Sequence, residues 1–84
     1  MYFVYLLLCD DDSIYTGITV NVEDRLRRHK NGSGAKYTRA RKAVRVLYTE
    51  QHNTRQSAAK REAQIKGWKR EKKLELISSS NQSV

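Results

Sequence analysis

Two short apolar runs, separated by a polar turn, open the chain. The first run spans Tyr2 to Leu8, is rich in aromatic and β-branched residues, and is followed by three aspartates and a serine. This pattern predicts a buried strand that ends in a tight turn. The second run, Ile14 to Thr19, predicts a strand that pairs back on the first as a hairpin.

Helical signals follow the hairpin. Asn21 can cap a helix whose first turn carries Glu23 and Asp24, two acids at the positive end of the helix dipole. The Asn-Gly pair at 31–32 predicts where this helix ends. The segment 35–41 is short and basic, and we expect one or two helical turns there.

The second half of the chain predicts one more strand and two more helices. Over residues 44–48, every second side chain is apolar or aromatic, which predicts a third strand. Asn53 or Thr54 can cap a helix, and Gly67 suits the left-handed position that would close it. A shorter basic helix is expected to follow, as far as about Ile77.

Together these elements predict one domain, residues 1–77, followed by a serine-rich tail, 78–84, that is expected to be disordered. A chain of 84 residues with 38% hydrophobic composition has room for one core. The predicted fold class is α/β: a small, mostly antiparallel three-stranded sheet flanked by helices, in the order β-β-α-(α)-β-α-α. The helix in parentheses is the short segment 35–41.

Charge points to a polyanionic partner. Lys and Arg number 17 against 9 Asp and Glu, which gives a net charge of +8. Nucleic acid is the first expectation. Two alternatives stay open: the basic residues are simply solvated helix faces, or they contact an anionic membrane surface. The membrane ranks last, because the aromatic residues lie in strand-like segments rather than on a basic amphipathic helix.

The cellular compartment of the protein can be inferred from its cysteine content and from the first apolar run. Cys9 is the only cysteine, so a disulfide framework is excluded and a reducing, cytoplasmic setting is expected. The run from Tyr2 to Cys9 is too short to cross a bilayer and has no basic flank before it. We therefore expect neither a signal peptide nor a membrane anchor.

Two tyrosines of the hairpin are candidates for chemistry. Tyr5 and Tyr15 share a face if Tyr15 pairs with Leu7, and point apart if it pairs with Leu8. The sequence leaves both registers open, and simple packing is the alternative role for each ring. Gly17 lies within the second strand, where a glycine often marks close approach by a ligand.

Charged residues on two helices complete the candidate set. Arg25 and His29 are spaced i and i+4, so they project from one helix face and could contact the same phosphate or be ordinary surface residues. Glu62 lies one turn after Ala58 and one turn before Ile65, in line with an apolar stripe. Its partner could be a structural cation or a divalent metal, since magnesium often takes only one or two protein carboxylates.

The order of these features resembles the GIY-YIG nuclease family: a tyrosine strand, a Tyr-x-Gly strand, an arginine-bearing helix and a later helix with a glutamate. The resemblance covers nearly the whole chain and is strongest to small standalone bacterial members. Five ordered blocks carry it: Val4-Tyr5-Leu6-Leu7, Tyr15-Thr16-Gly17-Ile18-Thr19, Arg25-Leu26-x-x-His29, Gly34-Ala35-Lys36-Tyr37-Thr38 and Gln64-Ile65-Lys66-Gly67-Trp68.

The resemblance implies a catalytic role for five residues. Tyr5 and Tyr15 would line the active site, and one of them would help to activate the attacking water. Glu62 would hold a single Mg²⁺ or Mn²⁺ ion. Arg25 would stabilise charge on the phosphate in the transition state, and His29 matches the position where relatives place a His or Tyr near the nucleophile. Because a tyrosine pKa near 10 makes a poor base at neutral pH, Arg25 and the metal are expected to lower it.

Substrate contacts are expected at Gly17, Lys36 and Tyr37, again by resemblance. The leading prediction is a divalent-metal-dependent endonuclease that hydrolyses DNA phosphodiester bonds, in repair or recombination. The alternative is a non-catalytic, basic nucleic-acid-binding module with a degenerate nuclease fold, in which Glu62 forms a structural ion pair. A third interpretation is a module docked on a larger repair or recombination protein, which would expose apolar surface near Trp68, Leu74 and Leu76.

Overall fold

The computed structural model describes residues 1–30 and 43–80. Within them the element order agrees with the predicted fold. The predicted helical turns at 35–41 lie outside the described residues. The elements are β1 (Tyr2–Cys9), β2 (Ile14–Thr19), α1 (Val22–Lys30), β3 (Ala43–His52), α3 (Arg55–Lys66) and α4 (Arg70–Ser80).

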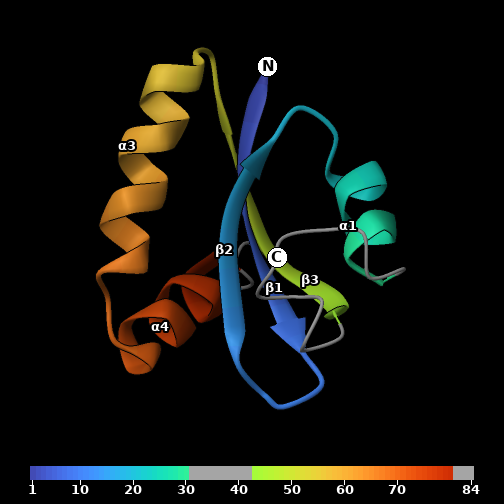
Figure 1. Ribbon diagram of the computed structural model, residues 1–84. Helices are drawn as coiled ribbons and strands as arrows, with labels where there is room; N and C mark the ends of the chain where they lie inside the picture. The colour runs from blue at the N-terminus through green and yellow to red at the C-terminus, as the bar shows by residue number, and fades with distance from the viewer. Residues whose placement is uncertain (31–42, 81–84) are drawn as a thin grey trace.

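A three-stranded sheet in the order β2-β1-β3 forms the middle of the molecule (Figure 1). Both pairings are antiparallel. Because β1 is the central strand, it is covered on both faces, and this explains its continuous apolar run. Val4, Tyr5, Leu6 and Leu7 are each at most 2% exposed. Burying an aliphatic side chain of this size contributes roughly 1.5–3 kcal/mol.

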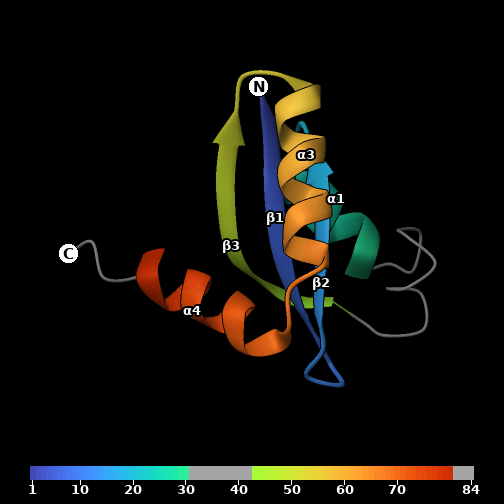
Figure 2. The same cartoon turned by 90° about the vertical axis from the view of Figure 1, so that its left-hand side faces the viewer.

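Helices cover the two faces of the sheet separately (Figures 1 and 2). Successive strand residues point to opposite faces. Val4 and Leu6 therefore pack with Ala58 and Ile65 of α3, in a core that extends to α4. Tyr5 and Leu7 point the other way and pack with Tyr15, Val46 and Leu26 of α1.

Side-chain caps begin the first two helices. The Asp24 amide donates to Oδ1 of Asn21 at 3.0 Å, which confirms the predicted cap of α1. Of the two candidate caps for α3, Thr54 fulfils the role: its Oγ1 accepts from the Ser57 amide at 3.1 Å. Each such cap typically contributes about 1 kcal/mol.

The end of α3 differs from the prediction. Gly67 has φ −79° and ψ −8°, so it is right-handed rather than left-handed. Its amide donates to the Gln64 carbonyl at 3.2 Å, and the Trp68 amide donates to the Ile65 carbonyl at 3.0 Å. The chain thus leaves the helix through tight i to i+3 turns, which satisfy the terminal carbonyls without a positive φ.

Helix α4 also departs from its predicted bounds, since it continues to Ser80, three residues beyond Ile77. Leu76 and Ile77 pack against the core, which anchors this last part of the helix. Residues 81–84 of the predicted tail lie outside the described residues. Trp68 packs against the same core, whereas Leu74 is exposed.

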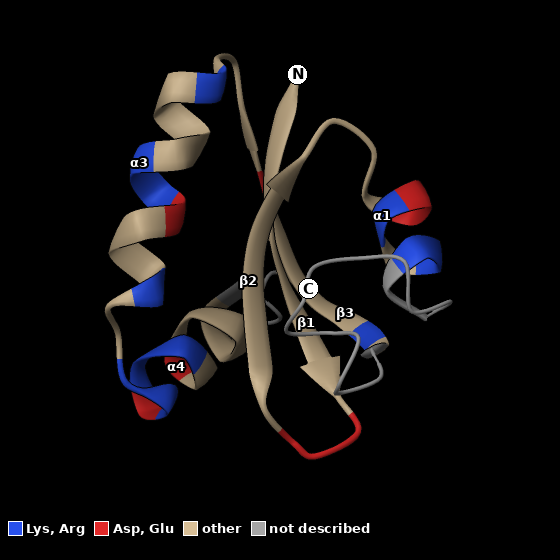
Figure 3. Ribbon diagram, viewed as in Figure 1, with Lys and Arg blue, Asp and Glu red and all other residues tan. Residues whose placement is uncertain are grey.

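Charge is distributed unevenly over the fold (Figure 3). Acidic residues occupy the β1–β2 turn, whereas Lys and Arg recur along the helices. Arg70 of α4 donates to the main-chain carbonyl of Asp12 and so ties this helix to the turn. Among the described residues, no helix is long and apolar enough to cross a membrane.

Candidate active site

The hairpin register brings the two candidate tyrosines together. Tyr15 lies opposite Leu7, and Tyr5 lies opposite Gly17, so both phenols point to the α1 side of the sheet. Their ring centroids are 6.3 Å apart, with the planes inclined by 45°. The register that would pair Tyr15 with Leu8 is therefore excluded.

Gly17 provides the space for the Tyr5 phenol. A Cβ added at Gly17 would lie 2.5 Å from Tyr5 Oη and 3.1 Å from Cε2 of Tyr15. The ring of Tyr5 thus reaches across to edge strand β2, where a side chain in place of glycine would collide with it. In the described structure it is this phenol that approaches Gly17 closely, and contact between Gly17 and a substrate remains a prediction.

Two charges from different helices act on the Tyr5 phenol. Burial raises the pKa of Tyr5 above its ordinary value of 10, and Tyr15 raises it further. Arg25 of α1 lowers this pKa, and Glu62 of α3 raises it. In the protein without metal, burial and the second phenol outweigh the guanidinium of Arg25, so the pKa of Tyr5 is raised. Tyr5 is accordingly a neutral hydroxyl at neutral pH. The expectation that Arg25 and a metal together lower this pKa stays a prediction.

The two phenols differ in accessibility. Tyr5 is 2% exposed, whereas Tyr15 is half-buried. A water molecule or a phosphate can therefore reach Tyr15 more readily than Tyr5.

Glu62 lies on α3 with its side chain 21% exposed. Its Oε2 atom is 3.3 Å from Nζ of Lys66, one helical turn further on. Lys66 is thus a structural cation of the kind that the sequence allowed as a partner for Glu62. An exposed pair with this spacing contributes only about 0.3–0.5 kcal/mol to stability. Such a weak pair leaves the carboxylate able to exchange its partner.

The candidate site offers few oxygen ligands for a divalent ion. Among residues 1–30 and 43–80, no group of three or more His, Cys, Asp or Glu side chains could hold a metal. Glu62 fits the single-carboxylate kind of magnesium site, in which waters and substrate phosphate oxygens complete the coordination shell. The donor set therefore suits Mg²⁺ or Mn²⁺ and does not suit zinc.

Three of the predicted site residues are not placed by the structure. His29 belongs to α1, one turn after Arg25 in sequence, but its side chain lies outside the described part of the chain. Lys36 and Tyr37 lie outside the described residues altogether. Their contacts with a substrate remain predictions.

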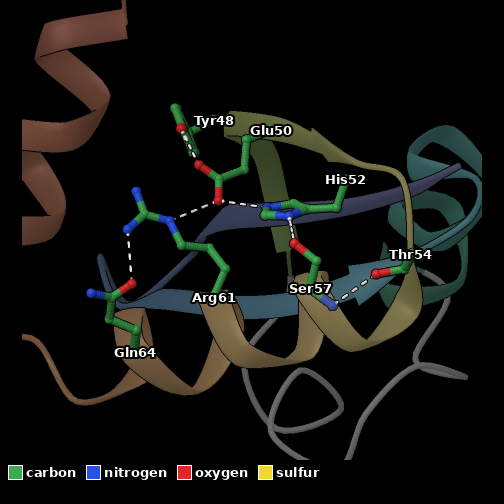
Figure 4. A network of polar contacts seen from close by, with 7 residues as sticks. All are labelled: Tyr48, Glu50, His52, Thr54, Ser57, Arg61 and Gln64. Carbon is green, nitrogen blue, oxygen red and sulfur yellow. Dashed lines mark hydrogen bonds and ion pairs between the residues drawn. The ribbon is translucent and has the colours of Figure 1, made fainter.

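A polar network centred on Glu50 was not predicted (Figure 4). Tyr48 Oη donates to Oε2 of Glu50 at 2.6 Å. The other carboxylate oxygen accepts from Nε of Arg61 at 2.7 Å and lies 3.0 Å from Nε2 of His52. The second ring nitrogen of His52 is 2.7 Å from the Ser57 hydroxyl. Residues two apart on a strand share a face, so the spacing of 48, 50 and 52 was the available signal.

The pKa values of this network show that Glu50 is a stabilised anion. Burial pushes the pKa of Glu50 upward, but the hydrogen bonds from Tyr48, His52 and Arg61, together with the charge of Arg61, outweigh it and hold the pKa below 4.5. Burial and the bond to Glu50 raise the pKa of Tyr48 to about 12.

The network joins β3 to α3 and has no catalytic role in our interpretation. Hydroxyl, imidazole and carboxylate follow one another from Ser57 to His52 to Glu50, as in hydrolase triads. Glu50 is already paired with Arg61, at 2.7 Å, so its charge is shared with a permanent cation. Because Glu62 follows Arg61 directly, the same contacts fix the rotation of α3 that directs Glu62.

Residues 1–75 match the family described as the GIY-YIG catalytic domain, so the chain belongs to the GIY-YIG family. It is 46% identical over 77 residues to a UPF0213 protein of Staphylococcus saprophyticus, a match that covers 92% of this chain and 94% of that protein. A UPF0213 protein of Clostridium perfringens is 48% identical over 81 residues, covering 96% and 87%.

A solved structure shares the fold. The solution NMR structure of the UPF0213 protein BH0048 from Bacillus halodurans matches with a TM-score of 0.62 and 38% identity, over 99% of this chain and 89% of that one. The resemblance read from the sequence blocks is thereby confirmed. Membership of the family indicates a nuclease-type activity with nucleic acid as the substrate class, and such nucleases generally use a divalent metal.

Proposed function

We propose that this protein is a divalent-metal-dependent endonuclease that hydrolyses DNA phosphodiester bonds. The observation that carries the proposal is that the hairpin register brings the two phenols together on the α1 side of the sheet, with ring centroids 6.3 Å apart. Opposite charges from two helices act on one of these phenols. Arg25 lowers the pKa of Tyr5 and Glu62 raises it, although α1 and α3 cover opposite faces of the sheet. These contributions support a site made of a carboxylate, a guanidinium and two hydroxyl groups, which is a set that phosphodiester hydrolysis needs.

The roles follow from charge and accessibility. Glu62 would hold the divalent ion, which supplies a Lewis acid for the phosphate. Arg25 would offset the negative charge that develops on the phosphate oxygens. The half-buried Tyr15 is the phenol that would contact the attacking water. Tyr5, which is buried and neutral, would donate a hydrogen bond and keep Tyr15 in place.

Cleavage of labelled DNA tests the proposal. Linear, flapped and branched substrates are incubated with Mg²⁺ or Mn²⁺ and with the native protein, Glu62→Gln or Arg25→Ala. Glu71→Gln and Arg45→Ala are matched controls, because both residues are exposed and belong to α4 and β3, which carry none of the proposed catalytic residues. We expect each site variant to lose at least about a hundredfold in rate, as is typical when one stabilising group is removed. The controls should retain cleavage.

The Glu62–Lys66 ion pair is the observation that favours the alternative, a non-catalytic nucleic-acid-binding module. In that case the native protein would cut no substrate with either metal, and Glu62→Gln would leave DNA binding unchanged. Salt-sensitive binding without cleavage would overturn the nuclease proposal. A role in repair or recombination remains a prediction, which preference for flapped or branched DNA would support.

A further inference from the structure

A basic pocket lies beside the candidate active site, at the end of β2. Its volume is about 200 Å³. It is formed where the ends of two strands meet the first turns of α1 and α3. The residues that line it are Tyr2, Ile18, Thr19, Val20, Arg25 and Arg55.

Two arginines from different helices line this pocket. Arg25 comes from α1, and Arg55 is the first residue of α3. Within residues 1–30 and 43–80, neither forms an ion pair with a carboxylate, whereas Arg61 is paired with Glu50. Two arginines in one small pocket, neither with a carboxylate partner among the described residues, favour phosphate groups, which arginine binds through its planar fork of donors.

The pocket adjoins the site proposed above along β2 and through Arg25. Ile18 follows Gly17 directly, about 3.4 Å further along the strand, although its side chain points to the α3 side of the sheet. Arg25 belongs to both places, since it lines the pocket and acts on Tyr5. On α3, Arg55 and Glu62 are seven residues apart, which puts them on the same helix face at a separation of about 10 Å along the axis.

The distribution of charge gives the direction in which a substrate strand would run. The β1–β2 turn carries acidic residues at the end of the hairpin opposite the starts of α1 and α3 (Figure 3). A polyanion bound near Tyr5 is repelled from that turn and attracted toward Arg55. It would therefore continue along β2 into the basic pocket.

We propose that Arg55 binds the phosphate that neighbours the scissile phosphate on one side, while Arg25 acts on the scissile phosphate itself. This inference rests on the proposed nuclease function. It makes the preferred substrate a strand that extends at least one nucleotide beyond the cleavage site on that side. Arg55 is then a specificity-determining residue, since it contacts a part of the substrate that does not react.

Binding without metal tests the subsite independently of cleavage. The affinity of Arg55→Ala for single-stranded oligothymidylate is measured by fluorescence anisotropy over a series of salt concentrations. Arg45→Ala is the matched control, because Arg45 is exposed and lies on β3, the opposite edge of the sheet. We expect Arg55→Ala to weaken binding roughly tenfold at low salt. It should also reduce the slope of log affinity against log salt by about 0.7. Equal effects of the two variants would overturn the proposal.

Amide chemical shifts locate the contact. Dithymidine monophosphate, titrated into the native protein, should shift the amides of Thr19, Val20 and Arg55, and these shifts should disappear in Arg55→Ala. Shifts confined to other parts of the chain would refute the subsite. If inorganic phosphate gives the same shifts and the dinucleotide gives none, the pocket is a general anion site and the proposal is wrong.

Kinetics separate this inference from the nuclease proposal. If the protein cleaves DNA, Arg55→Ala should raise KM with kcat unchanged, because the neighbouring phosphate is held equally in the ground and transition states. This increase should vanish on a substrate that ends at the cleaved nucleotide. If nothing is cleaved but the amide shifts appear, the nuclease proposal fails and the phosphate site stands.

Discussion

Replacing Gly17 by alanine is the most direct test of how the tyrosine pair is built. The added Cβ would lie 2.5 Å from Tyr5 Oη and 2.6 Å from its Cζ atom, distances that real Cβ contacts essentially never show. Neither Gly17 nor Gly67 has a positive φ, so the substitution is opposed by lack of space and not by backbone conformation. Something must move, and the Tyr5 ring is held between α1 and the sheet.

The expected cost follows from overpacking. Inserting a methyl group into a packed site typically costs about 1–3 kcal/mol. For a domain of this size, each kcal/mol lowers Tm by roughly 4–8 °C. Gly67→Ala is the matched control: a Cβ there meets its nearest atom, the Gln64 carbonyl oxygen, at 3.5 Å, and φ is −79°. That variant should be unchanged or more stable by roughly 0.4–1 kcal/mol, because alanine restricts the unfolded chain.

Urea unfolding of both variants measures these free energies. The cause is then isolated by repeating Gly17→Ala in a Tyr5→Leu background, where the colliding phenol is absent. In that background the cost of Gly17→Ala should fall by at least about 1 kcal/mol, a coupling expected for residues in direct contact. If Gly17→Ala were as stable as the native protein, or if its cost were the same with leucine at position 5, the account of Gly17 as space for the phenol would be refuted.

Three further predictions concern buried and partly buried polar groups. Tyr5 should remain protonated at pH 10 by NMR of its ring carbons, and Glu62→Gln should lower its pKa while Arg25→Ala raises it; unchanged titration would contradict the placement of these charges. Glu50 has a lowered pKa in the folded state, so its contribution to stability is present above pH 4.5 and is lost as the pH falls through the folded pKa. Urea unfolding at several acidic pH values should show that the free energy of unfolding falls less steeply with decreasing pH in Glu50→Gln than in the native protein. Thr16 is 3% exposed and, among the described residues, its hydroxyl has no hydrogen-bond partner, so Thr16→Val should increase stability by up to about 1 kcal/mol in the same assay.

Local patterns were sufficient to predict the elements of the fold, because each one depends on residues close together in sequence. The apolar run of β1 and the caps Asn21 and Thr54 are signals of this kind. Strand β3 extends to His52, beyond the predicted residue 48. The prediction stopped short because this part of the edge strand is polar and so has no apolar alternation. The conformation of Gly67 was predicted wrongly, since a glycine permits a left-handed turn but does not require one.

The candidate site was harder to predict, because its geometry depends on register and burial. A shift of one residue in the hairpin would have turned Tyr15 away from Tyr5, and no local pattern excluded it. The direction of the Tyr5 pKa shift depends on how deeply the ring is buried, which a sequence does not give. Arg25 and Glu62 shift the pKa of Tyr5 in opposite directions, and this depends on how two helices on different faces of the sheet are packed. Residues that are far apart in sequence give no local signal of such packing.

Helix α3 connects these features, because three sets of its residues follow different lines along the helix. Ala58 and Ile65 form the buried line that packs on the sheet. One flank bonds to the Glu50 network through three side chains: Ser57, Arg61 and Gln64. The other flank carries Arg55 and Glu62, which are seven residues apart and so within about 20° of each other around the axis. Since one residue corresponds to about 100° of rotation, a shift by a single position would break the network and turn both charges away from β2. The contacts that hold α3 on β3 therefore also direct Glu62, which the proposed function requires, and Arg55, which the proposed phosphate subsite requires.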